Sequence, residues 1–265
     1  MKCYDPENNR LVFLQEENVS STYWEGHWSK YDTQRALIGE NRLITGTTGR
    51  FLPRGSRILE GGCGLGRNVY ALSKKGFEAY GIDFASETLQ KVREVCPDLR
   101  LCVGDVTALP FPASFFDGYW SVGVIEHFYN GFAGAAREMH RVLRPGGYLF
   151  ISFPCLSPYR KHKIKRKKYG LWEADDSRQG NFYQFALLTD EVCSYFCSLG
   201  FRFVARQGLD GLKGLKDEIG NDAVRGVLQK LYNSPSLPLR AVRLVAGRML
   251  APFTRHCDLL VLQRK

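Results

Sequence analysis

The chain of 265 residues has no apolar run that approaches the ~20 residues a helix needs to cross a bilayer. Its longest candidate, residues 147–153, has only the length of a strand. Residues 1–6 are not followed by the apolar segment of a secretory signal peptide. We therefore expect a cytoplasmic protein, and a content of 44% apolar and 24% charged residues is typical of a folded globular chain.

Cysteine is present, but without the spacing of a metal site or a disulfide framework. The eight cysteines include no CxxC pair, and Cys193 and Cys197 have no histidine nearby to complete a zinc site. Cys63 lies in a glycine-rich segment, and Cys102 and Cys257 lie in apolar runs. We expect reduced cysteines that pack in the interior, and no bound metal.

Acidic residues are too few to balance the basic ones, and the net charge is +10 at neutral pH. Residues 160–168 carry seven Lys or Arg and no acid, residues 240–265 carry six Lys or Arg and one acid, and the rest of the chain is nearly neutral with a net charge of −2. Two interpretations stay open. These segments are either a solvated loop and a solubilising tail, or they contact phosphate groups on a substrate or a membrane surface.

The second basic segment also has the pattern of an amphipathic helix. Residues 237–250 place Arg240, Arg243 and Arg248 among aliphatic residues, which is typical of helices that lie on anionic membranes. Together with residues 160–168, such a helix predicts peripheral contact with the inner membrane face. The alternative is a helix that packs on the sheet with its arginines in solvent.

From residue 57 onward, short apolar runs alternate with amphipathic stretches. This alternation predicts an α/β fold, a parallel sheet with helices on both faces, whose strands end at one ligand-binding edge. One helix is expected from Ser86, its N-cap, another ends before the RPGG at 144–147, and a third spans 189–199. The expected strands are 57–60, 79–83, 101–105, 117–122, 148–153, 201–206 and 256–262.

We expect four parts along the chain. Residues 1–50 form an aromatic, helical segment, in which Trp24 and Trp28 either cover a ligand as a lid or pack against the sheet edge. The other parts are a core at 51–207 with a basic insertion at 155–180, a helical basic-amphipathic insertion at 208–253, and a final core strand at 254–265.

A glycine-rich turn follows the first of the core strands. Gly62, Gly64 and Gly66 allow backbone amides to approach a ligand closely, because no Cβ obstructs them. Dinucleotide-binding enzymes use a similar turn, but their third glycine falls here on Arg67. Glu60 also disfavours a pyrophosphate and favours a cation such as an ammonium or a sulfonium.

Two further acids come at or near the ends of the next strands. Asp83 is placed to accept hydrogen bonds from the hydroxyls of a ribose, which suits any nucleoside. Asp105 either accepts from the amino group of an adenine or serves as a helix N-cap. Three acids at one edge of a sheet predict a nucleoside-binding site.

These segments resemble the motifs of the class I S-adenosylmethionine-dependent methyltransferases, specifically the type 11-like, small-molecule branch. One residue departs from the family pattern, because Gly61 stands where an aliphatic residue is usual. The resemblance implies a Rossmann-like, doubly wound sheet of seven strands in the order 3-2-1-4-5-7-6, with the last strand antiparallel. The matching segments follow the family's order and are residues 58–67, 80–83, 104–112, 121–127 and 141–147.

The resemblance also implies the cofactor, S-adenosylmethionine, with S-adenosylhomocysteine as product, and the residues around it. In this family the glycine turn cradles the methionyl end, which implies a role for Glu60 near the amino group. Asp83 would hold the ribose, Phe84 would lie beside the adenine and Asp105 would bind its amino group. The other implied cofactor contacts are Gly62, Cys63, Gly64, Gly66, Arg67, Val106, Ser121 and Gly123.

His127 follows the fourth strand and is the candidate general base, since imidazole titrates near neutral pH. Glu126 either orients His127 or lines the pocket. For both residues the alternative is a purely structural role. Tyr183 and Trp24 are candidates for the substrate side.

We expect methyl transfer to a small-molecule or lipid-linked acceptor, most simply at oxygen. An RNA or other nucleic-acid substrate is disfavoured, because residues 124–127 lack the Asn/Asp-Pro-Pro-aromatic run of base-amino methyltransferases. An NAD-type oxidoreductase is disfavoured by Glu60 and Arg67. A protein that binds S-adenosylmethionine or S-adenosylhomocysteine without catalysis is the remaining alternative.

Overall fold

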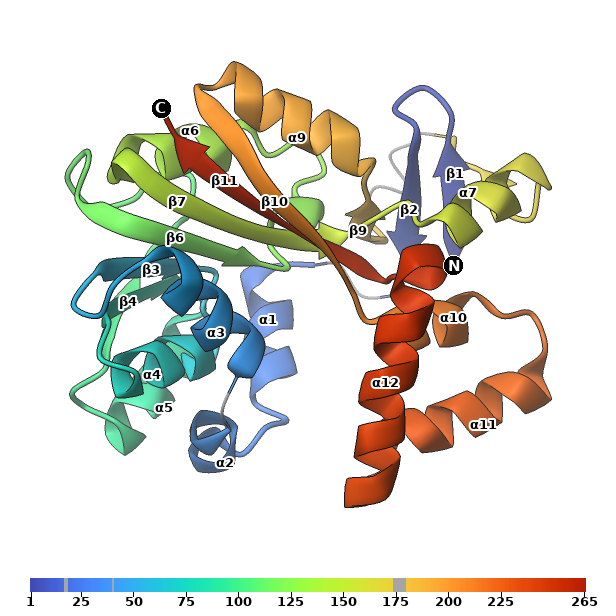
Figure 1. Cartoon of the computed structure of the whole chain (residues 1–265), viewed down its shortest axis with the longest axis horizontal. Coiled ribbons are helices and arrows are strands. Elements are labelled where there is room, and N and C mark those ends of the chain that lie inside the picture. The colour runs from blue at the N-terminus through green and yellow to red at the C-terminus, as the bar shows by residue number, and fades with distance from the viewer. Residues whose placement is uncertain (17–18, 40, 174–179) are drawn as a thin grey trace.

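The computed structural model describes residues 1–16, 19–39, 41–173 and 180–265 (Figure 1). Residues 17, 18 and 40 of the expected N-terminal segment, and residues 174–179 of the expected basic insertion, lie outside the described residues. The described chain contains two β-sheets, a large one with helices on both faces and a smaller one beside it.

The large sheet has the expected topology. Its order is β10-β11-β7-β6-β3-β4-β5, which in order along the chain is 3-2-1-4-5-7-6. The last strand runs antiparallel to both of its neighbours, so the predicted Rossmann-like arrangement is confirmed. The strands are β3 (Arg57–Gly61), β4 (Glu78–Asp83), β5 (Arg100–Val103), β6 (Phe116–Val122), β7 (Leu143–Pro154), β10 (Phe201–Leu209) and β11 (Cys257–Arg264).

Each face of this sheet is covered by helices with an apolar stripe. On one face lie α3 (Arg42–Phe51), α4 (Arg67–Lys74) and α5 (Ser86–Val95), and on the other lie α6 (Ala133–Val142) and α9 (Thr189–Ser198) (Figure 1). The stripe of α6, for example, buries Ala135, Met139 and Val142 at helical spacing. Two apolar cores result, one on each side of the sheet.

Alternate residues of the central strands enter opposite cores, as the pleat requires. In β6, Tyr119 belongs to the core under α6, whereas Trp120 belongs to the core under α3. The Trp120 ring stacks on Phe150 at 4.6 Å between centroids, and its indole nitrogen donates to the Thr48 hydroxyl at 2.9 Å. The buried polar atom of this large side chain is therefore satisfied.

The smaller sheet was not expected from the sequence. Its order is β8-β1-β2-β9, so the first residues of the chain, anticipated as part of a helical segment, form a hairpin instead. The hairpin pairs with strands about 170 residues later, and such remote pairing leaves no local pattern in the sequence. The strands are β1 (Lys2–Asp5), β2 (Arg10–Leu14), β8 (Gly170–Leu171) and β9 (Phe182–Ala186).

Helices α1 (Ser21–Trp28) and α2 (Thr33–Ile38) follow the hairpin and lie below the large sheet in Figure 1. Residues 160–168, expected as a loop, contribute mostly to helix α7 (Pro158–Lys165). Pro158 at the first position and the Ser157 hydroxyl, which accepts from the Arg160 amide, begin this helix. The insertion before β11 folds into α10 (Gly211–Glu218), α11 (Asp222–Asn233) and α12 (Leu237–Thr254).

No helix among the described residues combines the length and the apolar character needed to span a membrane. The eight cysteines are all free thiols, and Cys3, Cys63 and Cys155 are buried.

Gly61, the departure from the family pattern, is explained by its neighbour on β6. A Cβ at Gly61 would lie 2.0 Å from the hydroxyl oxygen of Tyr119, so the tyrosine fills the space of an aliphatic side chain. The Tyr119 hydroxyl is buried and has no hydrogen-bond partner in the described part of the chain. A small residue at one position and a large one at the other thus complement each other.

We predict that Gly61→Ala destabilises the protein by roughly 1–3 kcal/mol, because it overpacks this contact. Tyr119→Leu should cost stability alone but should relieve the clash, so the double variant should be less destabilised than the sum of the single variants. Urea unfolding of the four proteins measures this coupling. Additive effects would show that Gly61 and Tyr119 do not compete for the same space.

Candidate functional site

A cavity of about 690 Å³ opens where β3, β4, β5 and β6 end, and helix α1 covers part of it. This is the edge at which ligands bind in doubly wound sheets. Most of the predicted site residues line the cavity, and these are Trp24, Glu60, Gly62, Cys63, Arg67, Asp83, Phe84, Asp105, Val106, Gly123 and His127.

Five predicted residues lie outside the cavity lining. Gly64 faces the Trp28 ring, and Gly66 is the N-cap residue of α4 and faces Leu99. Ser121 is completely buried within β6. The other two, Glu126 and Tyr183, lie behind His127 and are described below.

The turn between β3 and α4 requires glycine. Gly62, Gly64 and Gly66 have φ angles of +72°, +49° and +69°, in the left-handed region that residues with a Cβ rarely adopt. A Cβ at Gly64 would also lie 2.6 Å from the ring of Trp28. The turn therefore sits directly against the aromatic side chain of α1.

Asp83 joins this turn to the end of β4. Its Oδ2 accepts from the Gly64 amide at 2.7 Å, and its Oδ1 accepts from the Ala85 amide at 3.0 Å. Each carboxylate oxygen keeps a second lone pair for a ligand. Burial raises the pKa of Asp83 above its ordinary value, against these two hydrogen bonds.

Glu60 combines one satisfied oxygen with one unsatisfied oxygen. Its Oε1 accepts from the Asn68 side chain at 2.6 Å, and Asn68 in turn accepts from the Asn41 side chain at 2.8 Å. Its Oε2 is buried without a partner in the described residues. Burial raises the pKa of Glu60 to about 8, and the nearby Asp83 carboxylate adds to the rise.

Sequence reasoning missed both asparagines, which line the cavity. Asn68 lies in the first turn of α4, directly after the glycine turn, so its position relative to the glycines was the available signal. Asn41 caps α3 by accepting from the Ile44 amide, and nothing local marks it as a neighbour of Glu60. The two residues come together only because α3 and α4 pack on the same face of the sheet.

His127 ends a short 3₁₀ turn, Ile125–His127, after β6. Its Nδ1 lies 2.7 Å from the carbonyl oxygen of Tyr183. Because a carbonyl oxygen only accepts, Nδ1 carries the proton and Nε2 keeps its lone pair. Burial lowers the pKa of His127 to about 4, so the ring is neutral at physiological pH.

Glu126 does not form the hydrogen bond that would orient His127, since that contact belongs to the Tyr183 carbonyl. The Glu126 side chain is buried, and its Oε2 has no partner among the described residues. Burial raises the pKa of Glu126 to about 8. The Tyr183 ring packs against His127 with 5.2 Å between centroids, so its carbonyl and its ring both hold the histidine.

Asp105 and Phe84 lie on the solvent side of the cavity. The Asp105 side chain accepts from the Thr107 amide at 2.7 Å in a local turn, and no helix begins there, in contrast to the N-cap alternative. Phe84 is 47% exposed. Both residues therefore remain accessible to a ligand at the mouth of the cavity.

Helix α1 is attached to the core by Glu25, a residue that the sequence did not single out. The Glu25 carboxylate accepts from the amides of Glu87 and Thr88, each at 2.9 Å, and from the Thr88 hydroxyl at 2.6 Å. Ser86, the expected N-cap, is instead the first residue of α5, and the N-cap residue Ala85 makes no side-chain bond. Glu25 satisfies these amides from outside the helix.

The inner surface of α1 is aromatic. Trp24 lies edge-on to His127 with 5.0 Å between centroids, and Trp24 stacks with Trp28 at 6.1 Å. The cavity therefore has a carboxylate at one wall and a neutral histidine with aromatic rings at another. This arrangement suits a ligand with a cationic group and a planar or apolar part.

Residues 59–151 match the family model described as a methyltransferase domain. Three curated relatives are similar over 140–155 residues. A 2-methyl-6-phytyl-1,4-hydroquinone methyltransferase of Synechocystis sp. is 31% identical, and the match covers 57% of this chain and 45% of the relative. A malonyl-[acyl-carrier protein] O-methyltransferase of Salmonella typhimurium is 29% identical, and the match covers 57% of each chain. A demethylmenaquinone methyltransferase of Renibacterium salmoninarum is 31% identical, and the match covers 49% of this chain and 58% of the relative. The chain spans about half the length of these relatives.

Two solved structures share the fold over almost the whole chain. A protein from Pyrococcus horikoshii aligns with a TM-score of 0.56 at 18% identity, over 91% of this chain and 99% of its own. A TehB-like methyltransferase from Corynebacterium glutamicum aligns with a TM-score of 0.56 at 17% identity, over 93% of this chain and 100% of its own. The matched domain, its motifs and its sheet order thus agree with one another, and all three are consistent with a class I methyltransferase, a family whose cofactor is S-adenosylmethionine.

Proposed function

We propose that this protein transfers a methyl group from S-adenosylmethionine to an oxygen atom of a small-molecule or lipid-linked acceptor. The observation that carries this proposal is the neutral His127, which lines the same cavity as the unsatisfied carboxylate of Glu60. Calorimetry with S-adenosylmethionine tests cofactor binding. Formation of S-adenosylhomocysteine with a panel of hydroxylated acceptors tests transfer.

The residues present fit this cofactor. The free Oε2 of Glu60 suits the ammonium group of the methionyl part, because a buried carboxylate oxygen without a partner gains most from a cation. Asp83, Asp105 and Phe84 suit the ribose and the adenine, as the family resemblance implies. A volume of about 690 Å³ lies within the usual range of small-molecule sites.

When bound, the cofactor supplies a methyl group on a positively charged sulfur, an intrinsically good leaving group. The Nε2 lone pair of His127 accepts the proton of an acceptor hydroxyl as its oxygen attacks. The Tyr183 carbonyl holds the ring through Nδ1–H and stabilises the imidazolium that forms. Trp24 and Phe128 line the cavity beside His127 and exclude water from it.

The relatives support the acceptor class. Two of them act, by their names, on a phytyl hydroquinone and on a malonyl group attached to a carrier protein. The aromatic rings beside His127 suit a planar or apolar acceptor. None of the described residues that line the cavity favours a nucleic-acid acceptor over these.

We predict that Glu60→Gln weakens S-adenosylhomocysteine binding by about tenfold to a hundredfold, since hydrogen bonds to charged groups contribute roughly 1.5–3 kcal/mol. Binding of the ammonium needs the ionised carboxylate, whereas the free protein holds Glu60 with a pKa of about 8. Binding therefore releases a proton, and wild-type affinity should rise between pH 6 and pH 8. Calorimetry across this range should show no such rise for Glu60→Gln.

The matched control ligand is 5′-methylthioadenosine, which lacks the amino-acid part. It should bind the wild type and Glu60→Gln equally well and without this pH dependence. An equal loss for both ligands would place the effect of Glu60 on the fold of the glycine turn rather than on the ammonium.

We predict that His127→Ala lowers turnover by roughly 10²–10⁴-fold, the usual contribution of a general base. His127→Asn is the matched variant, because its side-chain amide retains a donor toward the Tyr183 carbonyl but has no basic nitrogen. Both should retain S-adenosylhomocysteine affinity. Since burial lowers the pKa of His127 to about 4, wild-type turnover should show no acidic limb from this residue between pH 5.5 and 8. Full activity of His127→Asn would remove the base from the mechanism.

We further propose that α1, within the segment expected as a lid, closes over the cofactor and that Glu25 is its latch. Trp28 lies against the glycine turn, Trp24 lies against His127, and both line the cavity. The Glu25 carboxylate sits at the N-terminus of α5, where a negative charge is favourable. Opening of α1 would break this contact and uncover both ends of the site.

Glu25→Ala should accelerate dissociation of S-adenosylhomocysteine about fivefold, since loss of a helix cap costs roughly 1 kcal/mol. Stopped-flow fluorescence of Trp24 and Trp28 reports the rate. Glu87→Gln removes a charge from the same end of α5 without removing the latch, and should leave the rate unchanged. Equal rates for wild type and Glu25→Ala would show that α1 does not control exit.

A further inference from the structure

The outer face of α11 and α12 is unusually apolar. More than half of the exposed large apolar side chains in the described chain lie in residues 224–253. On α12, Val242, Val245, Met249 and Phe253 are 50%, 58%, 73% and 66% exposed. Their spacing of three and four residues places them in one stripe along the helix.

Close packing on α10 fixes which side of α12 faces outward. A Cβ at Gly211 would lie 2.3 Å from the Ala251 nitrogen, so the backbones of α10 and α12 touch there. Arg243 is directed inward and donates to the Tyr232 carbonyl of α11. The sequence left open a helix with its apolar side inward and its arginines in solvent, whereas the structure leaves the apolar stripe outside.

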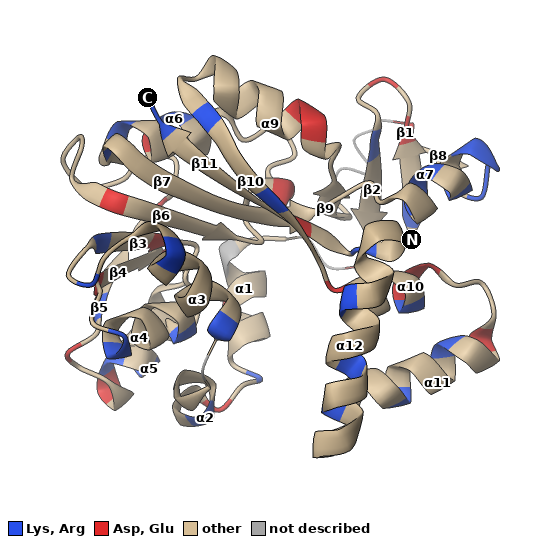
Figure 2. Ribbon diagram, in the orientation of Figure 1, with Lys and Arg blue, Asp and Glu red and all other residues tan. Residues whose placement is uncertain are grey.

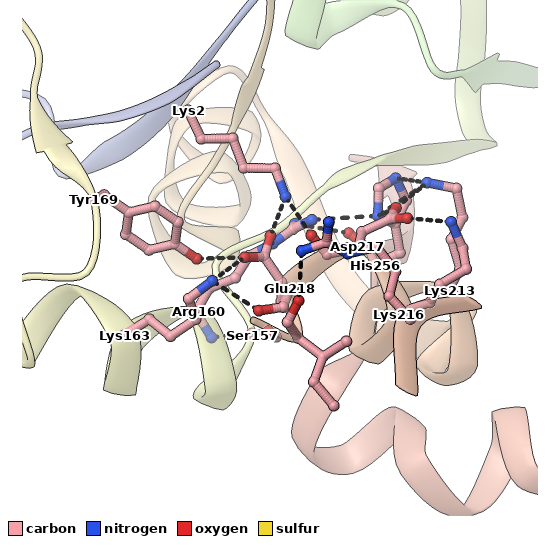
Figure 3. Close-up of polar contacts among 12 residues, drawn as sticks. Lys2, Ser157, Arg160, Lys163, Tyr169, Lys213, Lys216, Asp217, Glu218 and His256 are labelled. Carbon is pink, nitrogen blue, oxygen red and sulfur yellow. Dashed lines mark hydrogen bonds and ion pairs between the residues drawn. The ribbon is translucent and has the colours of Figure 1, made fainter. Parts of the chain in front are cut away.

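A buried ion-pair cluster anchors this helical unit to the body (Figure 3). Glu218, the last residue of α10, accepts from Arg160 at 3.0 Å, from Lys2 at 2.8 Å and from Lys163 at 2.9 Å. The hydroxyl of Tyr169 donates to it as well, at 2.7 Å. These partners come from α7, β1 and the segment before β8, so α10 is held rigidly and α12 with it.

The same cluster accounts for two of the seven cations in residues 160–168. Arg160 is fully buried and Lys163 is paired, so both cations serve the fold and not an external phosphate. Five cations of this segment remain exposed, whereas the apolar surface that a membrane contact also needs lies on the α11–α12 face.

The charges of α12 are of one sign only, and the single acid of α11, Asp222, is its first residue and pairs with Arg225. No Asp or Glu occurs between Asp222 and Asp258, and Figure 2 shows basic residues alone along α12. Arg240 and Arg248 are exposed beside the apolar stripe. A symmetric contact with a second copy would bring like charges together, whereas anionic lipid headgroups complement them. The cations between the two acids are Arg225, Lys230, Arg240, Arg243, Arg248 and Arg255.

We propose that the outer face of α11 and α12 docks on an anionic membrane surface. Val242, Val245, Met249 and Phe253 enter the boundary between headgroups and acyl chains, and exposed arginines contact lipid phosphates. The helices lie on the surface and do not cross it. This inference does not depend on methyl transfer, although it would bring the cavity close to a lipid-linked acceptor.

Co-sedimentation of the full chain with vesicles tests the proposal without cofactor or acceptor. The protein should bind phosphatidylcholine vesicles that contain 30% phosphatidylglycerol at least tenfold more tightly than pure phosphatidylcholine vesicles, and high salt should weaken binding. The double variant Val245→Asp/Met249→Asp should lose binding at least tenfold. Arg240→Gln/Arg248→Gln should lose affinity only for the anionic vesicles.

Phe203→Asp is the matched control, because it removes an apolar side chain of similar exposure (51%) on β10 and should leave vesicle binding unchanged. Retained S-adenosylhomocysteine affinity shows that each variant is folded. Absence of wild-type binding to anionic vesicles, or equal binding of Val245→Asp/Met249→Asp, would overturn the proposal. So would a wild-type dimer in light scattering that the same double variant converts to a monomer.

Discussion

The site depends on the contact between the Gly64 amide and the Asp83 carboxylate. This bond ties the turn after β3 to the end of β4, and the three left-handed glycines let the turn reach it. With the turn held there, Glu60 and Asn68 face one cavity and Trp28 can approach the backbone of Gly64. The neighbouring strands then supply Asp105 and His127 at the same edge of the sheet.

Burial determines the protonation states of the ionisable groups Glu60 and His127 in the cavity. Glu60 and His127 both lie where water is scarce, and the loss of hydration favours the neutral form of each, which raises the pKa of the acid and lowers that of the base. A cationic ligand would restore the charge of Glu60. His127, held by a carbonyl, stays neutral and keeps one lone pair toward the cavity. Burial thus favours the neutral form of both Glu60 and His127 in the free protein.

Helices α1 and α10 and the N-terminal hairpin lie outside the core, and buried or partly buried polar contacts hold them in place. Glu218 joins α10 to α7 and to the N-terminal hairpin, and Glu25 joins α1 to α5. Breaking a buried ion pair costs more than forming it gains, because an unpaired charge is left behind. Such contacts therefore specify where each added element lies, while the apolar cores on the two faces of the sheet supply most of the stability.

The sequence alone determined the alternation of strands and helices, the glycine turn and the acids at the strand ends, because these follow from local periodicity and from motifs with fixed spacing. The order of the strands in the sheet came from the family resemblance that these motifs carry. The tertiary structure alone decided the small sheet, the neighbours Asn41 and Glu25, the partner of His127 and the outward direction of the apolar stripe on α12. These features join residues far apart in the chain. Packing between elements determines which face of an amphipathic helix is buried and which carbonyl contacts an imidazole. The local sequence does not predict either.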